Sequence, residues 1–285
     1  MTSTAPPTAA VRVLSSLIEA RTGQQISPAR SWRVEASLKP VLRETGIASI
    51  DQLVGQLVGG RNDSLATRVV EALLNNETSF FRDANIFGQL DREALESLRR
   101  HRSTSRRLKI WSAACSTGQE AYSLAMMLRD GGSRWSGWTF DIMGSDISEM
   151  VVSRARAGRF SRFEIQRGLP VRTMLRWFRE DGEEWAVDPA LRRDVRFQVH
   201  DLRNPAPGSF DLILCRNVLM YFAVPVRTQV FDRLAAALDP GGILMLGAGE
   251  TVIGQTDLFA SDPGMRGLYI ARNEVSQSPL RAASR

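Results

Sequence analysis

Apolar residues in the first eighty positions recur with the spacing of an α-helix. Their stripes occupy four segments, at residues 11–18, 34–42, 50–57 and 65–74. Steps of three and four residues put these side chains on one face of each helix, so we expect the four helices to pack together. Pro40 should kink or end the second helix, because proline lacks the N–H that a helix interior uses. Residues 11–82 are therefore predicted to form a small all-helical N-terminal domain, after a disordered N-terminus at residues 1–10.

A linker is expected between this helical domain and the rest of the chain. Residues 84–100 have the pattern of an amphipathic helix, and they run into a connector rich in arginine, from Arg99 to Arg107. We interpret the charge run as a solvated face, where such residues are usually found. Linker helix and basic connector together span residues 83–106.

From residue 107 the pattern changes to short buried strands that alternate with helices. Strands are predicted within residues 107–115, 138–148, 195–202, 210–217, 241–249 and 265–272, and helices at 119–130, 148–157 and 224–238. This alternation predicts an α/β fold built on a doubly wound, mostly parallel sheet. Residues 160–194 interrupt the alternation, so we expect an inserted subdomain there, within a domain that spans 107–285.

Composition narrows the function classes. The 285 residues are 43% hydrophobic and 24% charged, which is ordinary for a globular protein. The net charge of +6 comes almost wholly from arginine, with many acidic residues interspersed, so it does not indicate a nucleic-acid partner. Two cysteines, Cys115 and Cys215, without a CxxC pair predict no metal site and a reducing, cytoplasmic location. The N-terminus lacks the pattern of a signal peptide, and no apolar run predicts membrane insertion.

Candidate binding residues follow the predicted strands. They are the small-residue loop Ala113–Gly118, then Asp146, the pair Asp201–Leu202, and the pair Arg216–Asn217. Ligands of open α/β sheets bind at the carboxyl ends of the strands. Taken singly, the loop could be only a tight turn, and Asp146 could be only a helix cap. Together they predict a ligand that contains adenosine, and because the loop is not GxGxxG, S-adenosylmethionine fits better than a dinucleotide.

The chain resembles a known family at this point. The resemblance runs from about residue 12 to 272 and is carried by NNETSFFRD, WSAACSTGQEAYSLAMML, GSDIS, RGLP, VRFQVHDL, FDLILCRNVLMYF and LDPGGILMLGAGET. These segments are similar to the CheR chemotaxis methyltransferases, which methylate glutamate side chains of bacterial chemoreceptors with S-adenosylmethionine. The resemblance implies a Rossmann-like methyltransferase domain with a small inserted β-subdomain, preceded by a helical domain.

The resemblance also implies roles for individual residues. Cofactor-binding positions are implied at Asn76, Thr78, Arg82, Glu120, Asp146, Asp201, Leu202, Arg216 and Asn217. Asp146 would hold the ribose, and Glu120 would meet the methionine end of the cofactor. Arg82, Arg216 and Tyr221 would lie near the transferred methyl group as catalytic residues. We expect Arg82 or Arg216 to position the substrate carboxylate, while Tyr221 orients the methyl donor.

Some positions depart from the family pattern. Asp201 stands where the family usually has asparagine, so an amide donor near the adenine is lost while an acceptor is kept. Gln119 and Ala121 flank Glu120 where the family has GEEPYS, and GAGE at 247–250 replaces GHSE. None of these changes removes a charge that the implied site needs.

The implied reaction yields glutamate methyl esters and S-adenosylhomocysteine, and the implied partner is the cytoplasmic domain of a methyl-accepting chemoreceptor. We expect a monomer that binds no nucleic acid. Two other functions stay open on sequence grounds. One is a methyltransferase acting on another acceptor, such as nucleic acid, and the other is a non-catalytic module that senses S-adenosylmethionine.

Overall fold

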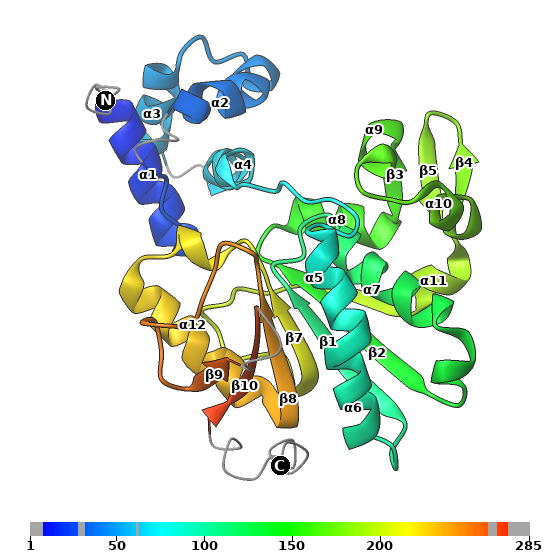
Figure 1. The fold of residues 1–285 in the computed structure, drawn as a ribbon. Helices are drawn as coiled ribbons and strands as arrows, with labels where there is room; N and C mark the ends of the chain where they lie inside the picture. The colour runs from blue at the N-terminus through cyan, green and yellow to red at the C-terminus, as the bar shows by residue number, and fades with distance from the viewer. Residues whose placement is uncertain (1–7, 28–31, 61–62, 262–266, 273–285) are drawn as a thin grey trace. The chain divides into compact units, whose positions relative to one another are not determined.

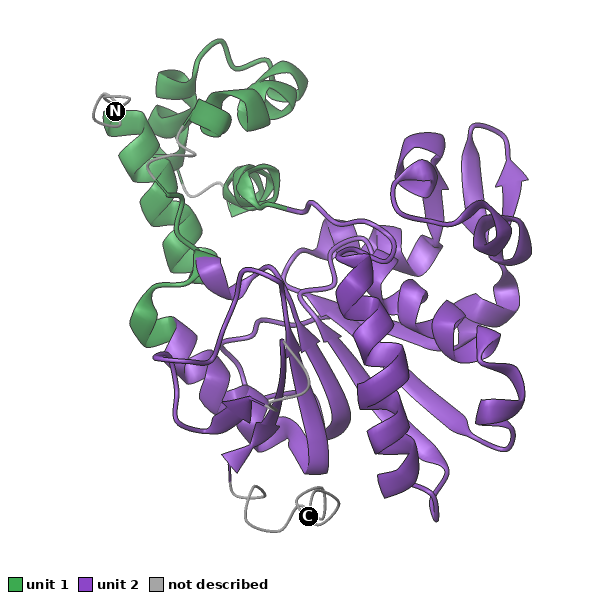
Figure 2. Cartoon of the chain, in the orientation of Figure 1, with its two compact units in different colours: residues 1–75, 221–226 green, residues 76–220, 227–285 purple. Residues whose placement is uncertain are grey.

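The computed structural model describes residues 8–27, 32–60, 63–261 and 267–272. The chain divides into two compact units, residues 1–75 with 221–226, and residues 76–220 with 227–285 (Figure 2). Most of the N-terminal segment expected to be disordered, residues 1–7, lies outside the described residues. For residues 8–10 the expected disorder was wrong. Ala9 and Ala10 are helical, and the Thr8 side chain accepts a hydrogen bond from Val11 N.

The first unit contains four helices (Figure 1), which are α1 (Ala9–Thr22), α2 (Trp32–Thr45), α3 (Ile50–Gly59) and α4 (Asp63–Leu73). Each helix contributes a fully buried side chain to one core, namely Leu14, Leu38, Leu53 and Val69. The predicted helical region is thus confirmed. Pro40 does not end the second helix, because α2 continues through it to Thr45. Burial of Leu38 and Val41 on the flanking turns offsets the hydrogen bond that proline cannot donate.

The second unit is built on a seven-stranded sheet. Its strands are β1 (Arg107–Ala113), β2 (Thr139–Asp146), β6 (Val195–Val199), β7 (Phe210–Cys215), β8 (Leu238–Leu246), β9 (Phe259–Ser261) and β10 (Leu268–Ala271), in the order β6-β2-β1-β7-β8-β10-β9. Neighbours from β6 to β8 are parallel, and β10 is antiparallel to both of its neighbours. This arrangement confirms the Rossmann-like α/β prediction. Strand β9 escaped prediction, because three residues carry too little periodicity.

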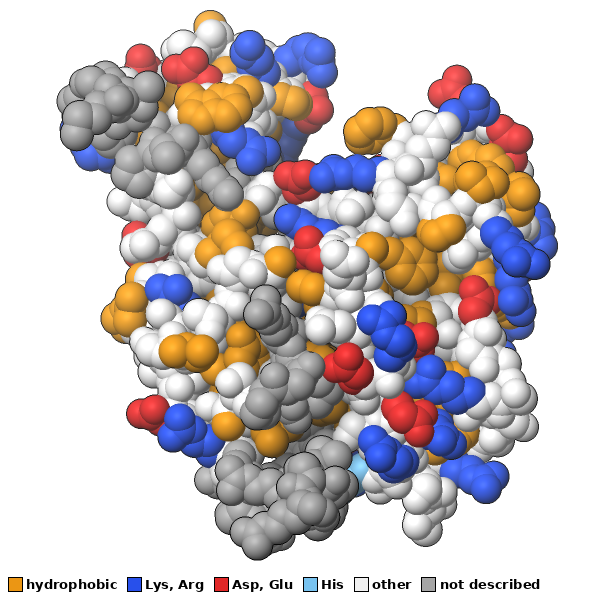
Figure 3. Space-filling view, in the orientation of Figure 1, with side chains coloured by type: hydrophobic (Ala, Val, Ile, Leu, Met, Phe, Trp, Pro, Cys, Tyr) orange, Lys and Arg blue, Asp and Glu red, His pale blue; other side chains and the backbone are white. Residues whose placement is uncertain are grey.

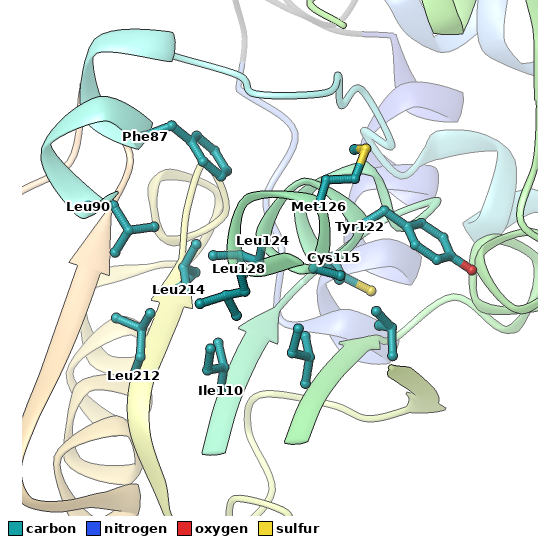
Figure 4. Close-up of a cluster of buried hydrophobic side chains, with 14 of the residues drawn as sticks. Phe87, Leu90, Ile110, Cys115, Tyr122, Leu124, Met126, Leu128, Leu212 and Leu214 are labelled. Atoms are coloured by element: carbon teal, nitrogen blue, oxygen red, sulfur yellow. The ribbon is translucent and has the colours of Figure 1, made fainter. Parts of the chain in front are cut away.

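A column of helix packs on this sheet where a linker was expected. It consists of α5 (Ala84–Gln89), a π-helical turn η2 (Leu90–Ala94) and α6 (Leu95–His101). Leu90, Leu95 and Leu98 are buried in the same core as strand residues. Figure 4 shows Phe87 and Leu90 facing Leu212 and Leu214 of β7. Residues 84–101 are therefore a layer of the second unit and not a free linker, because the apolar stripe of the helix is covered by the sheet.

The remaining helices of the sheet connections are α7 (Gln119–Asp130), η3 (Gly132–Trp135), α8 (Glu149–Ala157), η4 (Leu219–Tyr221) and α12 (Val224–Ala237). Their positions match the helices predicted at 119–130, 148–157 and 224–238 to within a residue or two. None of the helices in the described part of the chain is long and apolar enough to cross a membrane.

One arginine of the expected basic connector is part of the packed structure. Arg102 binds the carboxylate of Asp211, and its Nη2 donates to the Pro240 carbonyl at 2.8 Å. The buried Asp211 also accepts from Lys109 N at 2.7 Å. The prediction of a wholly solvated charge run was therefore wrong at Arg102, because the connector turns back along the start of the sheet.

We expect Asp211→Ala to lower the free energy of unfolding by about 2–4 kcal/mol, because it leaves a buried N–H and a half-buried guanidinium without their acceptor. Asp181→Ala is the control, since the Asp181 side chain is 60% exposed and pairs with Arg159 at the surface. That change should cost less than about 1 kcal/mol. Urea denaturation of both variants measures the difference, and equal losses would contradict this role for Asp211.

The interruption at 160–194 is a small subdomain with its own sheet, which we call the insert. It comprises β3 (Arg159–Ser161), α9 (Arg162–Gln166), α10 (Val171–Trp177), β4 (Phe178–Asp181), β5 (Glu184–Val187) and α11 (Pro189–Arg193). The strands form an antiparallel sheet in the order β3-β5-β4. Rings of Phe160 and Phe178 lie 5.0 and 5.4 Å from the ring of Phe80. Residues 76–82 therefore belong with the second unit, whereas we expected the helical domain to extend to 82.

Candidate active site

The strand order of the second unit defines where a ligand can bind. From β1 the chain continues to β2 on one side of it, while β7 lies on the other side. In open α/β sheets, ligands bind at such a reversal, outside the carboxyl ends of the strands, and we use the word crevice for this region of the second unit. The loops after β1, β2, β6, β7 and β8 all leave the sheet at this edge, because those strands are parallel.

The loop after β1 is fixed to the end of β2 through Asp146. The carboxylate of Asp146 accepts from Ser116 N at 2.8 Å and from Ser148 N at 3.1 Å. Ala114 and Ser116 have φ angles of 58° and 50°, a conformation that non-glycine residues rarely adopt and that concentrates at functional sites. Helix α8 has its own cap in Ser148, whose side chain accepts from Val151 N. Asp146 therefore organises the crevice and is not merely a helix cap.

Glu120 and Arg216 form a buried ion pair beside this loop. Glu120 lies in the first turn of α7, where it accepts from Ser112 Oγ at 2.7 Å and from Arg216 Nη1 at 2.8 Å. Arg216 Nη2 donates to the Arg82 carbonyl at 2.8 Å and to Asp83 Oδ2 at 2.7 Å. Only 2% of the Arg216 side chain is exposed. Arg216, which directly follows β7, thus connects α7 with the segment before α5.

We call residues 76–82 the junction segment. Its start touches the loop after β1, because Ser116 Oγ donates to the Asn76 carbonyl at 2.7 Å. Phe81 N donates to Ser123 Oγ at 3.0 Å, and Arg82 Nη1 donates to the Glu77 carbonyl at 2.9 Å. The predicted positions Asn76, Thr78 and Arg82 are therefore on one segment held at the crevice.

The pair Asp201–Leu202, which follows β6, is held in place by burial and by an ion pair. Leu202 is buried, and the carboxylate of Asp201 is held by the Arg203 guanidinium at 2.7 Å and by Arg203 N at 2.8 Å. Burial lowers the pKa of the neighbouring His200 below its usual value. The Arg203 pair compensates the charge that aspartate introduces at a position where the resembling family has a neutral amide.

Glu250 is a site residue that sequence reasoning missed. Its carboxylate accepts from four main-chain N–H groups, those of Asn217 (2.6 Å), Val218 (3.0 Å), Leu219 (2.9 Å) and Gly247 (3.0 Å). This clamp holds Asn217 at a φ of 60°. The available signal was its place shortly after β8, at the edge where the other candidates lie.

Tyr221 is described with the first unit, residues 1–75 with 221–226. Its hydroxyl accepts from Asn75 Nδ2 at 2.6 Å. Tyr221 is thus the one predicted site residue that the structure does not group with the others.

Both cysteines are packing residues. Cys115 and Cys215 are buried, and burial raises the pKa of each thiol well above its usual value. A thiol with a raised pKa is a poor nucleophile at neutral pH, so neither cysteine has a part in the proposed chemistry.

The Rossmann-like sheet with this acidic edge is a fold that binds adenosine-containing ligands, and the match to known proteins makes this chain an S-adenosylmethionine-dependent methyltransferase. Residues 76–267 match the family described as CheR methyltransferase, SAM binding domain. The chain belongs to the CheR family.

Two curated relatives extend the match beyond that domain. The chain is 34% identical over 253 residues to the chemotaxis protein methyltransferase of Vibrio parahaemolyticus, covering 87% of this chain and 91% of that protein. It is also 34% identical over 241 residues to chemotaxis protein methyltransferase 1 of Pseudomonas aeruginosa, covering 82% and 87% respectively. These findings favour a chemotaxis methyltransferase. The two alternatives left open by the sequence, a non-catalytic sensing module and a methyltransferase acting on nucleic acid, are not favoured.

The residues at the edge fit S-adenosylmethionine. Its sulfonium and ammonium groups are cationic, and the edge carries the carboxylates of Glu120, Asp146 and Asp201. Six buried side-chain nitrogens in the described part of the chain have no hydrogen-bond partner, and two of them, Arg216 Nε and His200 Nε2, belong to residues that directly follow β7 and β6. Buried polar atoms are nearly always paired, and a polar ligand bound at this edge would supply partners for these two nitrogens.

Proposed function

We propose that this enzyme transfers the methyl group of S-adenosylmethionine to glutamate carboxylates in the cytoplasmic domains of bacterial chemoreceptors. The products are glutamate methyl esters and S-adenosylhomocysteine, and the reaction serves adaptation in the cytoplasm. The observation that carries the proposal is the network of Asp146, Glu120 and Arg216 at one sheet edge. It occurs in a chain similar over most of its length to chemotaxis methyltransferases.

We assign the cofactor's parts to residues along that edge. Asp146 accepts the ribose hydroxyls, since each carboxylate oxygen can accept more than one hydrogen bond. Glu120 attracts the ammonium of the methionine end, with its own orientation fixed by Ser112 and Arg216. The remaining contacts come from the residues of the adenine end, the junction segment and the β7 end, namely Asp201, Leu202, Asn76, Thr78, Arg82 and Asn217.

The acceptor needs no general base. A glutamate side chain has a reference pKa of about 4.3 and is ionised at neutral pH. The bound cofactor supplies a methyl group activated by the positive charge on sulfur. Since opposite charges are neutralised as the carboxylate attacks, strong hydration of either group slows the step. The protein's contribution is therefore to exclude water and to align the carboxylate with the methyl group.

Arg82 and Tyr221 are the side chains that we assign to alignment. Arg82 is half-buried on the junction segment, with Nη1 held by the Glu77 carbonyl. A tight two-point fork on the substrate carboxylate would stabilise the ground state more than the transition state. We therefore give Arg82 a single guiding contact with the acceptor, and Tyr221 a role in orienting the methyl donor. Arg216 supports Arg82 through its hydrogen bond to the Arg82 carbonyl.

Arg82→Ala should lower kcat by about 10- to 100-fold while changing the dissociation constant of S-adenosylhomocysteine by less than about threefold. The reason is that the guanidinium contacts the acceptor, whereas the main chain of the segment shapes the cofactor site. Steady-state methylation gives kcat, and calorimetry gives the dissociation constant. Equal losses in both quantities would make Arg82 a cofactor ligand only.

Residue-level mapping tests the acceptor. Purified enzyme, S-adenosylmethionine and receptor cytoplasmic fragments from the same organism are incubated, digested and examined by mass spectrometry. The proposal expects the methyl group on glutamate side chains of the receptor, and its loss when those glutamates are replaced by alanine. Methylation of lysine, of arginine or of added nucleic acid instead would contradict it.

A further inference from the structure

The turn Arg167–Pro170 of the insert lies against the main chain of the junction segment. A Cβ atom on Gly168 would lie 2.2 Å from the Phe80 carbonyl oxygen and 3.3 Å from its carbon. Gly168 also has a φ of 89°, which side-chain-bearing residues rarely adopt. The atoms it would strike are backbone atoms, so they cannot rotate away. Any other residue here must push the junction segment aside.

The insert holds the same segment at two further points. The Phe80 side chain is fully buried, with its ring edge-on to the rings of Phe160 and Phe178. Arg167 forms an ion pair with Glu77. The junction segment is therefore held by the insert at Glu77 and at the Phe80 ring, and the Phe80 carbonyl lies close against Gly168.

The other contacts of the segment are made with the crevice. Asn76 is held by Ser116 Oγ, and the same Ser116 donates its N–H to Asp146. At the far end, the Arg82 carbonyl accepts from the buried Arg216. Phe80 lies four residues from Asn76 and two from Arg82, so a shift at Phe80 has little chain in which to relax before it reaches either anchor.

We propose that the Arg167–Gly168 turn is a positioning element for cofactor binding, which fixes the junction segment in the geometry that the cofactor requires. The proposal rests on the proposed function, because it takes the junction segment as part of the cofactor site. It assigns to the insert a role in cofactor affinity, exerted through the segment and without contact between the insert and the cofactor.

A pair of glycine variants separates this role from backbone strain. Gly168→Ala introduces both a positive-φ alanine and the collision with Phe80. Gly182→Ala, in the β4–β5 turn of the same insert, introduces a positive-φ alanine without a collision. Gly182 has a φ of 66°, and nothing lies within 4 Å of its added Cβ. We expect Gly168→Ala to weaken S-adenosylhomocysteine binding about tenfold or more. Gly182→Ala should leave it within about twofold. Equal dissociation constants in the two variants would overturn the proposal.

The ion pair gives a second test that does not depend on Gly168→Ala folding. The side chains of Arg167 and Glu77 are 46% and 47% exposed, so removing either should barely change thermal stability. We expect Arg167→Ala and Glu77→Ala each to weaken S-adenosylhomocysteine binding about threefold, and the double variant to be no weaker than the single variants. Unchanged binding in Arg167→Ala, or additive losses, would contradict the coupling.

Asp146→Asn distinguishes failure of this inference from failure of the proposed function. If Asp146→Asn loses cofactor affinity while Gly168→Ala and Arg167→Ala keep it, the site assignment stands and the positioning role of the turn is wrong. If Asp146→Asn also keeps full affinity, the cofactor does not bind at this edge, and both the function and the inference fall.

Discussion

Asp146→Asn should weaken S-adenosylhomocysteine binding about 100-fold, the largest affinity loss that we expect from a single conservative change. Asparagine offers one acceptor oxygen and a donor amide where a carboxylate can accept from both ribose hydroxyls. The same change turns a donor toward one of the two N–H groups, Ser116 N and Ser148 N, that the carboxylate now holds. Loss of ligand contacts and loosening of the loop therefore act in the same direction.

Asp141→Asn is the matched control for this variant. Asp141 lies near the start of the same strand, β2, where it pairs with Arg107 and Arg196. Affinity there should stay within about twofold of the wild type, because surface ion pairs contribute little. Isothermal calorimetry on both variants measures the contrast. A dissociation constant for Asp146→Asn within about threefold of the wild type would be incompatible with a ribose contact.

Arg216→Ala should lower the free energy of unfolding by about 3–5 kcal/mol. The change leaves the carboxylates of Glu120 and Asp83 facing a site from which their guanidinium has been removed. An uncompensated buried charge is far more costly than the loss of a surface pair. It should also weaken cofactor binding, because Glu120 and the Arg82 carbonyl lose their common anchor.

Arg129→Ala controls for the removal of an ion-paired arginine. Arg129 makes two short hydrogen bonds to Asp194, yet its side chain is 48% exposed. Its loss should cost less than about 1 kcal/mol. Adding Glu120→Gln to Arg216→Ala should restore part of the stability, because a neutral amide needs no counter-charge. Urea denaturation resolves these differences, and similar losses in Arg216→Ala and Arg129→Ala would refute the buried network.

The distribution of charged side chains explains why the net charge of +6 does not indicate a nucleic-acid partner. Figure 3 shows acidic side chains standing among the basic ones on the displayed face of the molecule. Several of the arginines of the second unit are engaged by carboxylates, as in the pairs of Arg129 with Asp194 and Arg159 with Asp181. These pairs neutralise part of the positive charge locally.

The parts of the fold that sequence predicts are those with local signals. Strands β1, β2 and β7 are short apolar runs that end in small or polar residues, and parallel pairing then brings those ends to one edge. The edge, the loop after β1 and Asp146 follow from that rule alone. The α/β sheet, and the gathering of these strand ends at one edge, could therefore be predicted from the sequence.

The parts that escaped prediction depend on contacts between distant positions. Glu120 and Arg216 are 96 positions apart, and Arg102 and Asp211 are 109 apart. No periodicity reveals such pairs. The α5–α6 column looks like any amphipathic helix until the sheet that covers it is known. Glu250 follows three small residues in a loop, so its four N–H partners become visible only when β7 and β8 lie side by side.

Carboxyl methyl transfer is the central claim, and its product chemistry tests it most directly. Enzyme, methyl-labelled S-adenosylmethionine and membranes bearing the organism's own chemoreceptors are combined, and the receptor protein is then treated with mild alkali. We predict that label enters the receptor and leaves as volatile methanol, and that Asp146→Asn greatly lowers the transfer when S-adenosylmethionine is limiting. Label that stays on the protein through alkali, or no transfer by an enzyme that binds S-adenosylhomocysteine, would contradict the account.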